Sequence, residues 1–177
     1  GIFEKQCRQW VTHIFCIDDL ANRPHDCDLL LDPTPGRTPV EYQSKVPLDC
    51  KFLLGPRYAL VAAGFEEYRS QALRYRHTKT LIEKLIMSFG ATDPDDWTSS
   101  CLESLAPIST QIKIHVTLTD AAPHLDHVRK VCKATGATLH VNTQDMPYIM
   151  ANVDLAIGAC GGSSWERCCL GLPSIVG

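Results

Sequence analysis

The stretch Asp154-Leu-Ala-Ile-Gly-Ala-Cys-Gly-Gly-Ser-Ser-Trp-Glu-Arg167 decides the fold of this chain of 177 residues. Its beginning is a short apolar run, which is typical of a buried strand, and the glycines that follow favour a tight turn. A helix is expected from Ser163 onward, and Gly171 and Pro173 end it in the usual order. A strand, a glycine-rich turn and a helix in succession predict one βα unit of a parallel sheet.

The same alternation of strands and helices extends back from this stretch to residue 83. It predicts an α/β fold in which a Rossmann-like parallel sheet carries helices on both faces. The predicted strands are 85–89, 112–118, 138–142, 154–158 and a last one from Ser174, and the predicted helices between them include 122–134 and 146–151.

Two helix ends in this region carry clear signals. Asp93-Pro94 predicts a helix start, with Asp93 as the N-cap and Pro94 as the first helical residue. Asp95 and Asp96 would then lie in the first turn, where acidic side chains favour the helix dipole. Gly136 is expected to end the helix over 122–134.

The first sixty residues are less regular. A helix is expected near residues 4–10, strands are expected at 13–17 and 28–32, and three prolines mark a turn-rich stretch from Pro33 to Pro39. We therefore predict the end of a first Rossmann-like lobe, a polar and arginine-rich connector, and a nucleotide-binding Rossmann-like lobe. Their respective ranges are 1–63, 64–82 and 83–177. Because the chain starts at Gly1 and stops within a strand, we expect a fragment of a longer protein.

Composition argues against several classes of protein. The formal net charge of −3 disfavours a general nucleic-acid binder, which needs a basic surface. The apolar runs are too short to cross a bilayer and no signal peptide is visible, so a cytoplasmic protein without membrane contact is expected. Nine cysteines without a C-x-x-C pair favour reduced thiols over a disulfide framework or a structural zinc site.

The glycine-rich turn is the first candidate ligand site. Gly161 and Gly162 let a ligand approach the backbone closely, and the N–H groups at the start of the following helix suit a diphosphate. Ser163 and Ser164 add hydroxyl donors, and Glu166 is placed to accept from ribose hydroxyls. The alternative is structural, because Ser163 and Glu166 have the S-x-x-E spacing of a capping box, which is the simpler interpretation of the spacing alone.

Two further segments at predicted strand ends are candidates. Ser88 and Gly90 lie in a strand-to-helix turn at the carboxyl end of a strand, where α/β sheets bind ligands. The alternative there is an ordinary loop with an aspartate cap. His140 and Val141 end another strand and can present backbone groups to a flat base, although His140 alone is equally well interpreted as a partly buried structural histidine.

Four residues of the first lobe are candidates for lining a cleft. Asp18 and Asp19 follow a predicted strand, where paired acids serve acid–base or metal roles, but they are also typical of a solvated helix start. Arg57 and Tyr58 either reach a ligand or cover the surface of the lobe. No serine stands in a G-x-S-x-G context, so a serine hydrolase is not indicated.

Five blocks of the chain resemble, in order, a bacterial family that hydrolyses UDP-2,4-diacetamido-2,4,6-trideoxy-β-L-altropyranose in pseudaminic acid biosynthesis. The resemblance covers nearly the whole chain. It implies a GT-B-like fold with two Rossmann-like lobes and a metal-independent attack of water on the anomeric carbon that releases UDP, without a cofactor. The blocks are 17–32, 53–60, 88–94, 123–126 and 158–173.

The resemblance also implies roles for particular residues. Gly162, Ser163 and Ser164 would hold the diphosphate, Glu166 would hold the ribose, and Ser88, Gly90, His140 and Val141 would border the nucleotide. The family's catalytic histidine lies in a Gly-x-Gly-His-x-x-Arg motif that this chain lacks, so no catalytic residue is assigned. Ala91 stands where the family often has a second glycine.

Two alternatives from other functional classes remain open at this point. One is a non-catalytic nucleotide-sugar-binding module of a multidomain protein, and the other is a glycosyltransferase of the same fold, which transfers the sugar to an acceptor. In either case a UDP-sugar is the expected partner of the chain, and its oligomeric state is left open.

Overall fold

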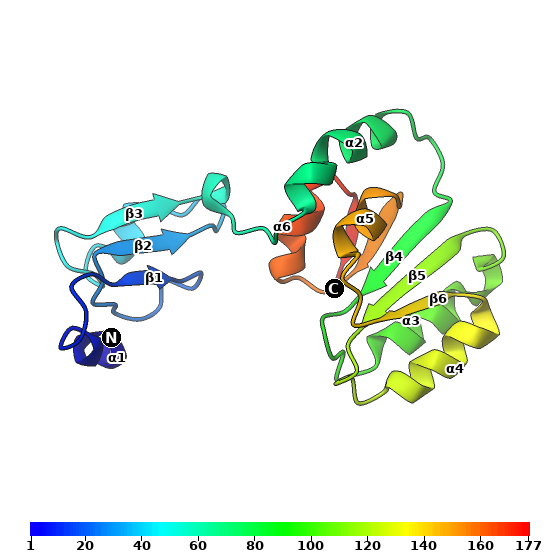
Figure 1. The fold of residues 1–177 in the computed structure, drawn as a ribbon, viewed down its shortest axis with the longest axis horizontal. Coiled ribbons are helices and arrows are strands. Elements are labelled where there is room, and N and C mark those ends of the chain that lie inside the picture. Colours follow the sequence, from blue (N-terminus) through cyan, green and yellow to red (C-terminus); the bar gives the residue numbers. More distant parts are fainter. The chain divides into compact units, whose positions relative to one another are not determined.

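A five-stranded parallel sheet forms the centre of residues 61–177, the larger of two units in the computed structural model, which describes residues 1–177 (Figure 1). The strand order is β6-β5-β4-β7-β8, so β4, the first strand of this unit, lies in the middle of the sheet and the later strands lie toward both edges. The strands are β4 (Lys84–Ser88), β5 (Lys113–Leu118), β6 (Thr138–Val141), β7 (Leu155–Gly158) and β8 (Ser174–Val176).

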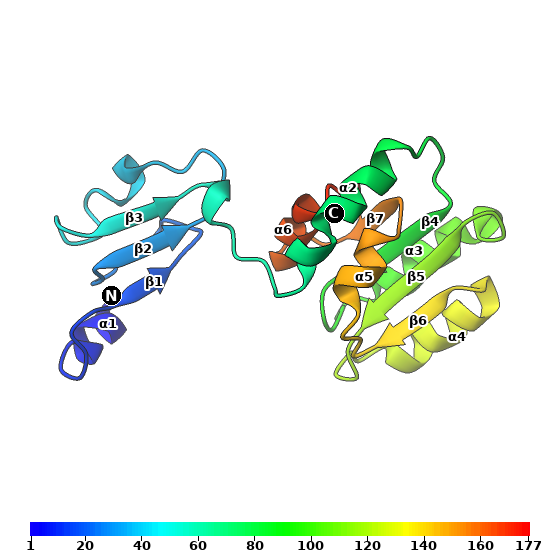
Figure 2. The ribbon, with the colours of Figure 1, turned by 45° about the horizontal axis from the view of Figure 1, so that its top comes forward.

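Helices cover both faces of this sheet (Figure 2), which confirms the predicted Rossmann-like α/β fold. Side chains alternate between the faces along each strand. In β4, Leu85 and Met87 pack beneath α3 and α4, whereas Ile86 packs beneath α2, α5 and α6. The helices are α2 (Phe65–His77), α3 (Trp97–Leu105), α4 (Leu125–Thr135), α5 (Met146–Ala151) and α6 (Gly162–Cys169), and a 3-10 turn, η3 (Ala106–Ile108), follows α3.

The helix α3 starts later than predicted. It begins at Trp97 with Asp96 as its N-cap, so the assignment of Asp93 as the N-cap was wrong, as was the placement of Asp95 and Asp96 in the first turn. Asp93 has a positive φ of 41° and turns the chain before the helix. Its carboxylate nevertheless accepts from the backbone N–H groups of Trp97 and Thr98 at 3.1 and 2.8 Å, so it caps the helix from outside. The predicted end of α4 at Gly136 is confirmed by that residue's left-handed conformation.

The expected connector 64–82 contains α2, an element of the larger unit. Phe65 and Ala72 of α2 are buried in the core of that unit. The guanidinium of Arg76 donates to the carbonyl oxygens of Leu170, Met150 and Val153. These bonds join α2 to the end of α6 and to the end of α5 with the loop that follows it. The boundary between the units therefore lies at residues 60 and 61, before α2 rather than after it.

Residues 1–60 form the smaller unit, whose centre is a three-stranded parallel sheet in the order β1-β2-β3. Its core includes Leu30 and the fully buried Tyr42. The strand β3 was not predicted from the sequence. The elements are α1 (Ile2–Cys7), β1 (Phe15–Ile17), β2 (Leu29–Asp32) and β3 (Lys51–Leu54), with 3-10 turns η1 (Pro39–Tyr42) and η2 (Pro56–Tyr58).

Two expectations for the whole chain concern its cysteines and the length of its apolar helices. All nine cysteines are free thiols. No helix combines the length and the apolar character that crossing a membrane requires.

Candidate functional site

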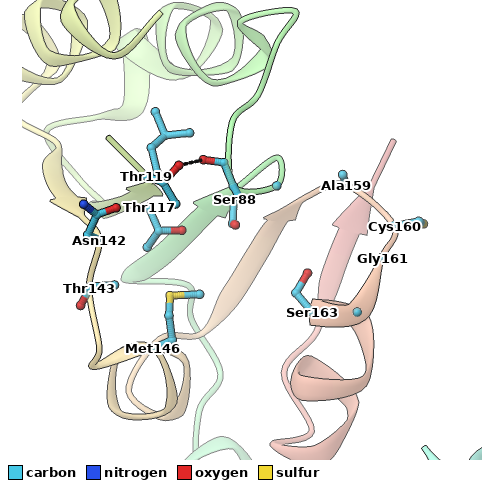
Figure 3. A pocket seen from close by; sticks show the side chains of 14 residues that line it. Ser88, Thr117, Thr119, Asn142, Thr143, Met146, Ala159, Cys160, Gly161 and Ser163 are labelled. Carbon is cyan, nitrogen blue, oxygen red and sulfur yellow. Dashed lines mark hydrogen bonds between the residues drawn. The ribbon is translucent and has the colours of Figure 1, made fainter. Parts of the chain in front are cut away.

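A pocket of about 370 Å³ lies where β4, β5, β6 and β7 end (Figure 3). The carboxyl ends of parallel strands are the place where open α/β sheets bind ligands. None of the lining residues is charged. The lining residues are Ser88, Gly90, Ala91, Thr117, Leu118, Thr119, Asn142, Thr143, Met146, Ala159, Cys160, Gly161, Gly162 and Ser163.

The turn after β7 forms one wall of this pocket, and its glycines serve different purposes. A Cβ atom on Gly158 would lie 1.9 Å from the carbonyl oxygen of Ser88, so only glycine fits between β7 and β4. A Cβ atom on Gly161 or Gly162 would meet no atom within 4 Å, and neither residue has a left-handed φ. Neither packing nor backbone strain therefore requires glycine at these two positions, and both leave open space at the pocket wall.

The start of α6 faces this open space. Its N-cap is Gly161, which has no side chain to cap the helix, and the predicted capping box between Ser163 and Glu166 does not form. Instead, the Oγ of Ser164 accepts from the N–H of Gly161 at 3.3 Å. The N–H groups of Gly162 and Ser163 have no acceptor in a preceding helical turn, and both residues line the pocket. Free N–H groups at a helix start attract anions.

A buried cation supports the turn from behind. Arg167 is 2% exposed, and its Nη2 donates to the carbonyl oxygen of Ala159 at 3.0 Å and to the Oγ of Ser164 at 2.9 Å. Both acceptors are uncharged, so the positive charge is not neutralised by these contacts. Burial raises the pKa of the neighbouring Glu166 carboxyl, and the charge of Arg167 opposes this shift.

Polar side chains from the ends of β5 and β6 form the opposite wall, which Figure 3 shows across the pocket from the glycine turn. The N–H and Oγ1 of Thr119 both donate to the carbonyl oxygen of Ala91, at 2.9 and 2.8 Å. The Oδ1 of Asn142 accepts from the N–H of Asp120 at 3.1 Å. These bonds tie together the loops that follow β4, β5 and β6, so the wall is positioned before any ligand arrives.

The structure brings five of the nine predicted nucleotide-site residues to this pocket. They are Ser88, Gly90, Gly161, Gly162 and Ser163. The threonines of the opposite wall were not predicted from the sequence. They lie at the carboxyl ends of β5 and β6, as Ser88 does in β4, and that rule could have identified them.

The other four predicted residues lie elsewhere. The side chain of Ser164 is engaged with Gly161 and Arg167, Glu166 does not line the pocket, and Val141 is the last residue of β6. The ring of His140 stacks on that of His115, with the Nε2 of His140 3.0 Å from the Nδ1 of His115.

This histidine pair borders a second pocket of about 390 Å³ beside α5, together with Lys84 and Lys113. Burial lowers the pKa of His115, and the charges of His140, Lys84 and Lys113 lower it further.

The four candidates of the first lobe all belong to the smaller unit, at the carboxyl ends of β1 and β3. Asp18 is buried and accepts from the hydroxyl of Tyr42 at 2.8 Å and from the N–H of Ala21 at 2.9 Å. Burial acts to raise the pKa of Asp18, but these hydrogen bonds and the charges of His25 and Arg23 together outweigh it, and the net pKa is lowered. Asp19 is exposed, and no helix follows it, so the interpretation as a solvated helix start was wrong. Arg57 and Tyr58 stack on each other, with the guanidinium 4.9 Å from the ring centroid.

Comparison with known proteins leaves the family open. The chain matches no protein-family model. It is 24% identical over 129 residues to the uncharacterized protein MJ1062 of Methanocaldococcus jannaschii, a match that covers 71% of this chain and 26% of that protein. The chain thus spans about a quarter of that relative's length. A crystal structure of aspartate transcarbamoylase from Trypanosoma cruzi with aspartate and phosphate is similar at a TM-score of 0.35 and 15% identity, over 85% of this chain and 52% of that one.

Proposed function

We propose that the pocket at the carboxyl ends of β4 to β7 binds the UDP part of a nucleotide sugar. We further propose that the protein to which this chain belongs hydrolyses UDP-2,4-diacetamido-2,4,6-trideoxy-β-L-altropyranose in pseudaminic acid biosynthesis. The observation that carries the first proposal is the open space at Gly161 and Gly162 beside the uncapped start of α6. The ordered sequence blocks carry the second proposal. They also imply a GT-B-like fold for the protein, which is part of the same proposal.

The diphosphate fits the wall formed by the glycine turn. The N–H groups of Gly162 and Ser163 and the hydroxyl of Ser163 are donors without charge of their own, and the dipole of α6 adds positive potential. Arg167 contributes a full positive charge from behind the turn. Because no acidic side chain lines the pocket, nothing there repels an anion.

The nucleoside fits the opposite wall. The volume of about 370 Å³ falls within the range of small-molecule sites, which is about 300–1,000 Å³. Thr117, Thr119 and Asn142 offer hydroxyl and amide groups for ribose and uracil, and Met146 offers a polarizable apolar surface for a flat base. This assignment does not require the ribose role of Glu166 or the base contact of His140 that the resemblance implies.

The bound diphosphate is also the leaving group of the proposed reaction. Water adds to the anomeric carbon, the bond from that carbon to the phosphate oxygen breaks, and UDP departs with the bonding electron pair. Donors aimed at the diphosphate stabilise the charge that develops on UDP. No residue of this chain is assigned as the base that takes the proton of water, so we expect the chain to bind UDP with negligible turnover.

Thermal unfolding with UDP, UMP and CMP tests the binding proposal on the 177-residue chain. UDP should raise the melting temperature, since a ligand at one hundred times its Kd stabilises the folded state by about 2.7 kcal/mol. UMP should act less, because it lacks the second phosphate. Ser163→Ala should weaken the shift, whereas Ser109→Ala, at a serine outside the pocket lining, should not. A shift with CMP and none with UDP would refute the proposal.

Product analysis tests the reaction. With the UDP-sugar and the longer protein, free sugar plus UDP indicates hydrolysis, whereas a new glycosidic bond indicates transfer. The absence of any product with retained UDP binding would instead favour the non-catalytic binding module.

A further inference from the structure

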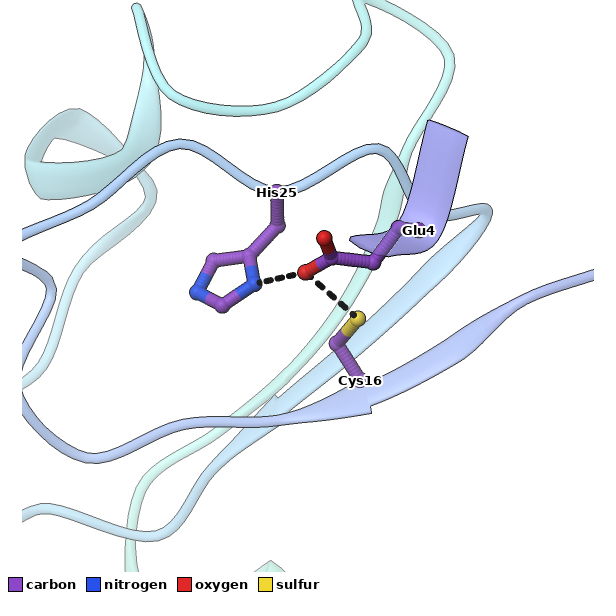
Figure 4. Close-up of side chains that lie close together, drawn as sticks. All are labelled: Glu4, Cys16 and His25. Carbon is purple, nitrogen blue, oxygen red and sulfur yellow. Dashed lines mark hydrogen bonds and ion pairs between the residues drawn. The ribbon is translucent and has the colours of Figure 1, made fainter. Parts of the chain in front are cut away.

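Three potential metal ligands of different chemistry converge in the smaller unit (Figure 4). Glu4 comes from α1, Cys16 from β1, and His25 from the loop before β2. The Nδ1 of His25 lies 2.9 Å from the Oε1 of Glu4, and the Sγ of Cys16 lies 3.9 Å from the same oxygen. All three ligand atoms lie within 4.8 Å of one another.

The second nitrogen of His25, on the side of the ring away from Glu4 (Figure 4), lacks a partner. The side chain of His25 is 2% exposed, and its Nε2 is buried without a hydrogen-bond partner. The nearest carboxylate oxygen, the Oδ2 of Asp18, lies 3.6 Å away, which is too long for a hydrogen bond. Buried polar atoms in proteins nearly always have a partner, so an orphaned ring nitrogen needs an explanation.

We propose that Glu4, Cys16 and His25 bind a divalent transition-metal ion, with Zn²⁺ as the best fit. A carboxylate, a thiolate and an imidazole are together a zinc-type ligand set. Around a tetrahedral zinc ion the ligand atoms lie about 3.4–3.6 Å apart, given the usual zinc–ligand distances. The spacings of 2.9 and 3.9 Å therefore need only small side-chain shifts.

Metal binding at Nδ1 also accounts for the orphaned nitrogen. With Nδ1 on the metal, the proton of His25 lies on Nε2 and faces the Oδ2 of Asp18 at 3.6 Å, so a shift of a few tenths of an ångström would complete a hydrogen bond. A ligating histidine that donates its other N–H to a carboxylate is the usual arrangement around zinc, and that carboxylate positions the ring. Asp18 is held in place by Tyr42 and Ala21, so it is a positioning residue with a fixed carboxylate.

A pocket and two further thiols surround the proposed metal site. His25 borders a pocket of about 450 Å³. Cys27 and Cys50 lie nearby with their sulfur atoms 3.7 Å apart, and burial raises the pKa of both thiols. Binding converts the Cys16 thiol to a thiolate, and its proton passes to solvent.

Cobalt substitution tests the site on the whole chain without any nucleotide, so the result is independent of the proposed UDP binding. Chain stripped of metal with a chelator is titrated with Co²⁺, and one equivalent should produce the absorption of a cobalt–thiolate bond. Zn²⁺ should then displace the Co²⁺ mole for mole. No such absorption in the unmodified chain would overturn the proposal.

Variants identify the ligands. Cys16→Ser should abolish the absorption, whereas Cys27→Ser, a buried thiol of the same core, should keep it. An absorption that survives Cys16→Ser, or one that Cys27→Ser removes, would overturn the assignment. Asp18→Asn should weaken Zn²⁺ binding about 10- to 100-fold while keeping the absorption. If Cys16→Ser does not fold, Glu4→Gln replaces it, and unchanged Zn²⁺ affinity in a folded Glu4→Gln chain would overturn the proposal.

Discussion

Gly162→Ala should move the stability of the folded chain and its affinity for UDP in opposite directions. The new Cβ meets no atom within 4 Å. Gly162 is the first residue of α6, and its φ is not left-handed. Replacing glycine by alanine at such a position stabilises a protein by about 0.4–1 kcal/mol. The same methyl group occupies the space in front of the free N–H groups. Loss of one hydrogen bond to the charged diphosphate weakens binding by about 1.5–3 kcal/mol, which is roughly 10- to 100-fold in Kd.

Two measurements on the same variant check this prediction. Thermal unfolding without ligand should show a melting temperature raised by roughly 1–8 °C, given about 2–8 °C per kcal/mol for domains of this size range. Titration calorimetry should show the weaker UDP binding. Gly177→Ala is the matched control, since its Cβ also meets no atom and it lies outside the pocket lining. Unchanged UDP affinity in a stabilised Gly162→Ala chain would refute the placement of the diphosphate.

Three further predictions concern the sheet and the support of the turn. Gly158→Ala should destabilise the chain by about 1–3 kcal/mol or more in urea unfolding, because the new Cβ overlaps the carbonyl oxygen of Ser88. Arg167→Met should cost about 1–3 kcal/mol by the same measurement and also weaken UDP binding, because two partly buried acceptors lose their donor. Because the pKa of His115 is lowered, the folded state binds fewer protons than the unfolded state. Stability is therefore full above the unfolded pKa of about 6.5 and falls below it, and melting temperatures at decreasing pH should fall less in His115→Gln than in the unmodified chain.

The larger unit could be predicted well because local signals there agree with the tertiary fold. The strands around Ile86, Val116 and Ala156 are short apolar runs bounded by turn residues, and the structure places all of them in one parallel sheet. The start of α3 was misplaced because the carboxylate of Asp93 accepts from N–H groups of a helix that Asp93 does not enter. Sequence spacing indicates that an aspartate caps a helix, but not whether that aspartate directly precedes the helix or lies further back in the turn.

The two missed elements depend on partners that are remote in the sequence. The helix α2 is polar enough to read as a connector, yet Phe65, Ala72 and Arg76 join it to residues of α5 and to the end of α6. The strand β3 exists because Lys51–Leu54 pairs with β2 across more than twenty residues. The Glu4, Cys16 and His25 cluster is of the same kind, since the spacing of these residues matches no metal motif.

The sequence spacing at the start of α6 left two interpretations open, helix capping and ligand binding, and the structure tests the first of them. Capping by Ser163 and Glu166 was the simpler interpretation, but Ser164 makes the reciprocal bond to Gly161 instead. The hydroxyl of Ser163 is therefore free of a capping role and lies at the pocket wall. Glu166 is equally free of one, and burial raises its pKa. The structural interpretation that competed with ligand binding no longer explains the position of the Ser163 hydroxyl, and the experiments with UDP test whether a ligand does.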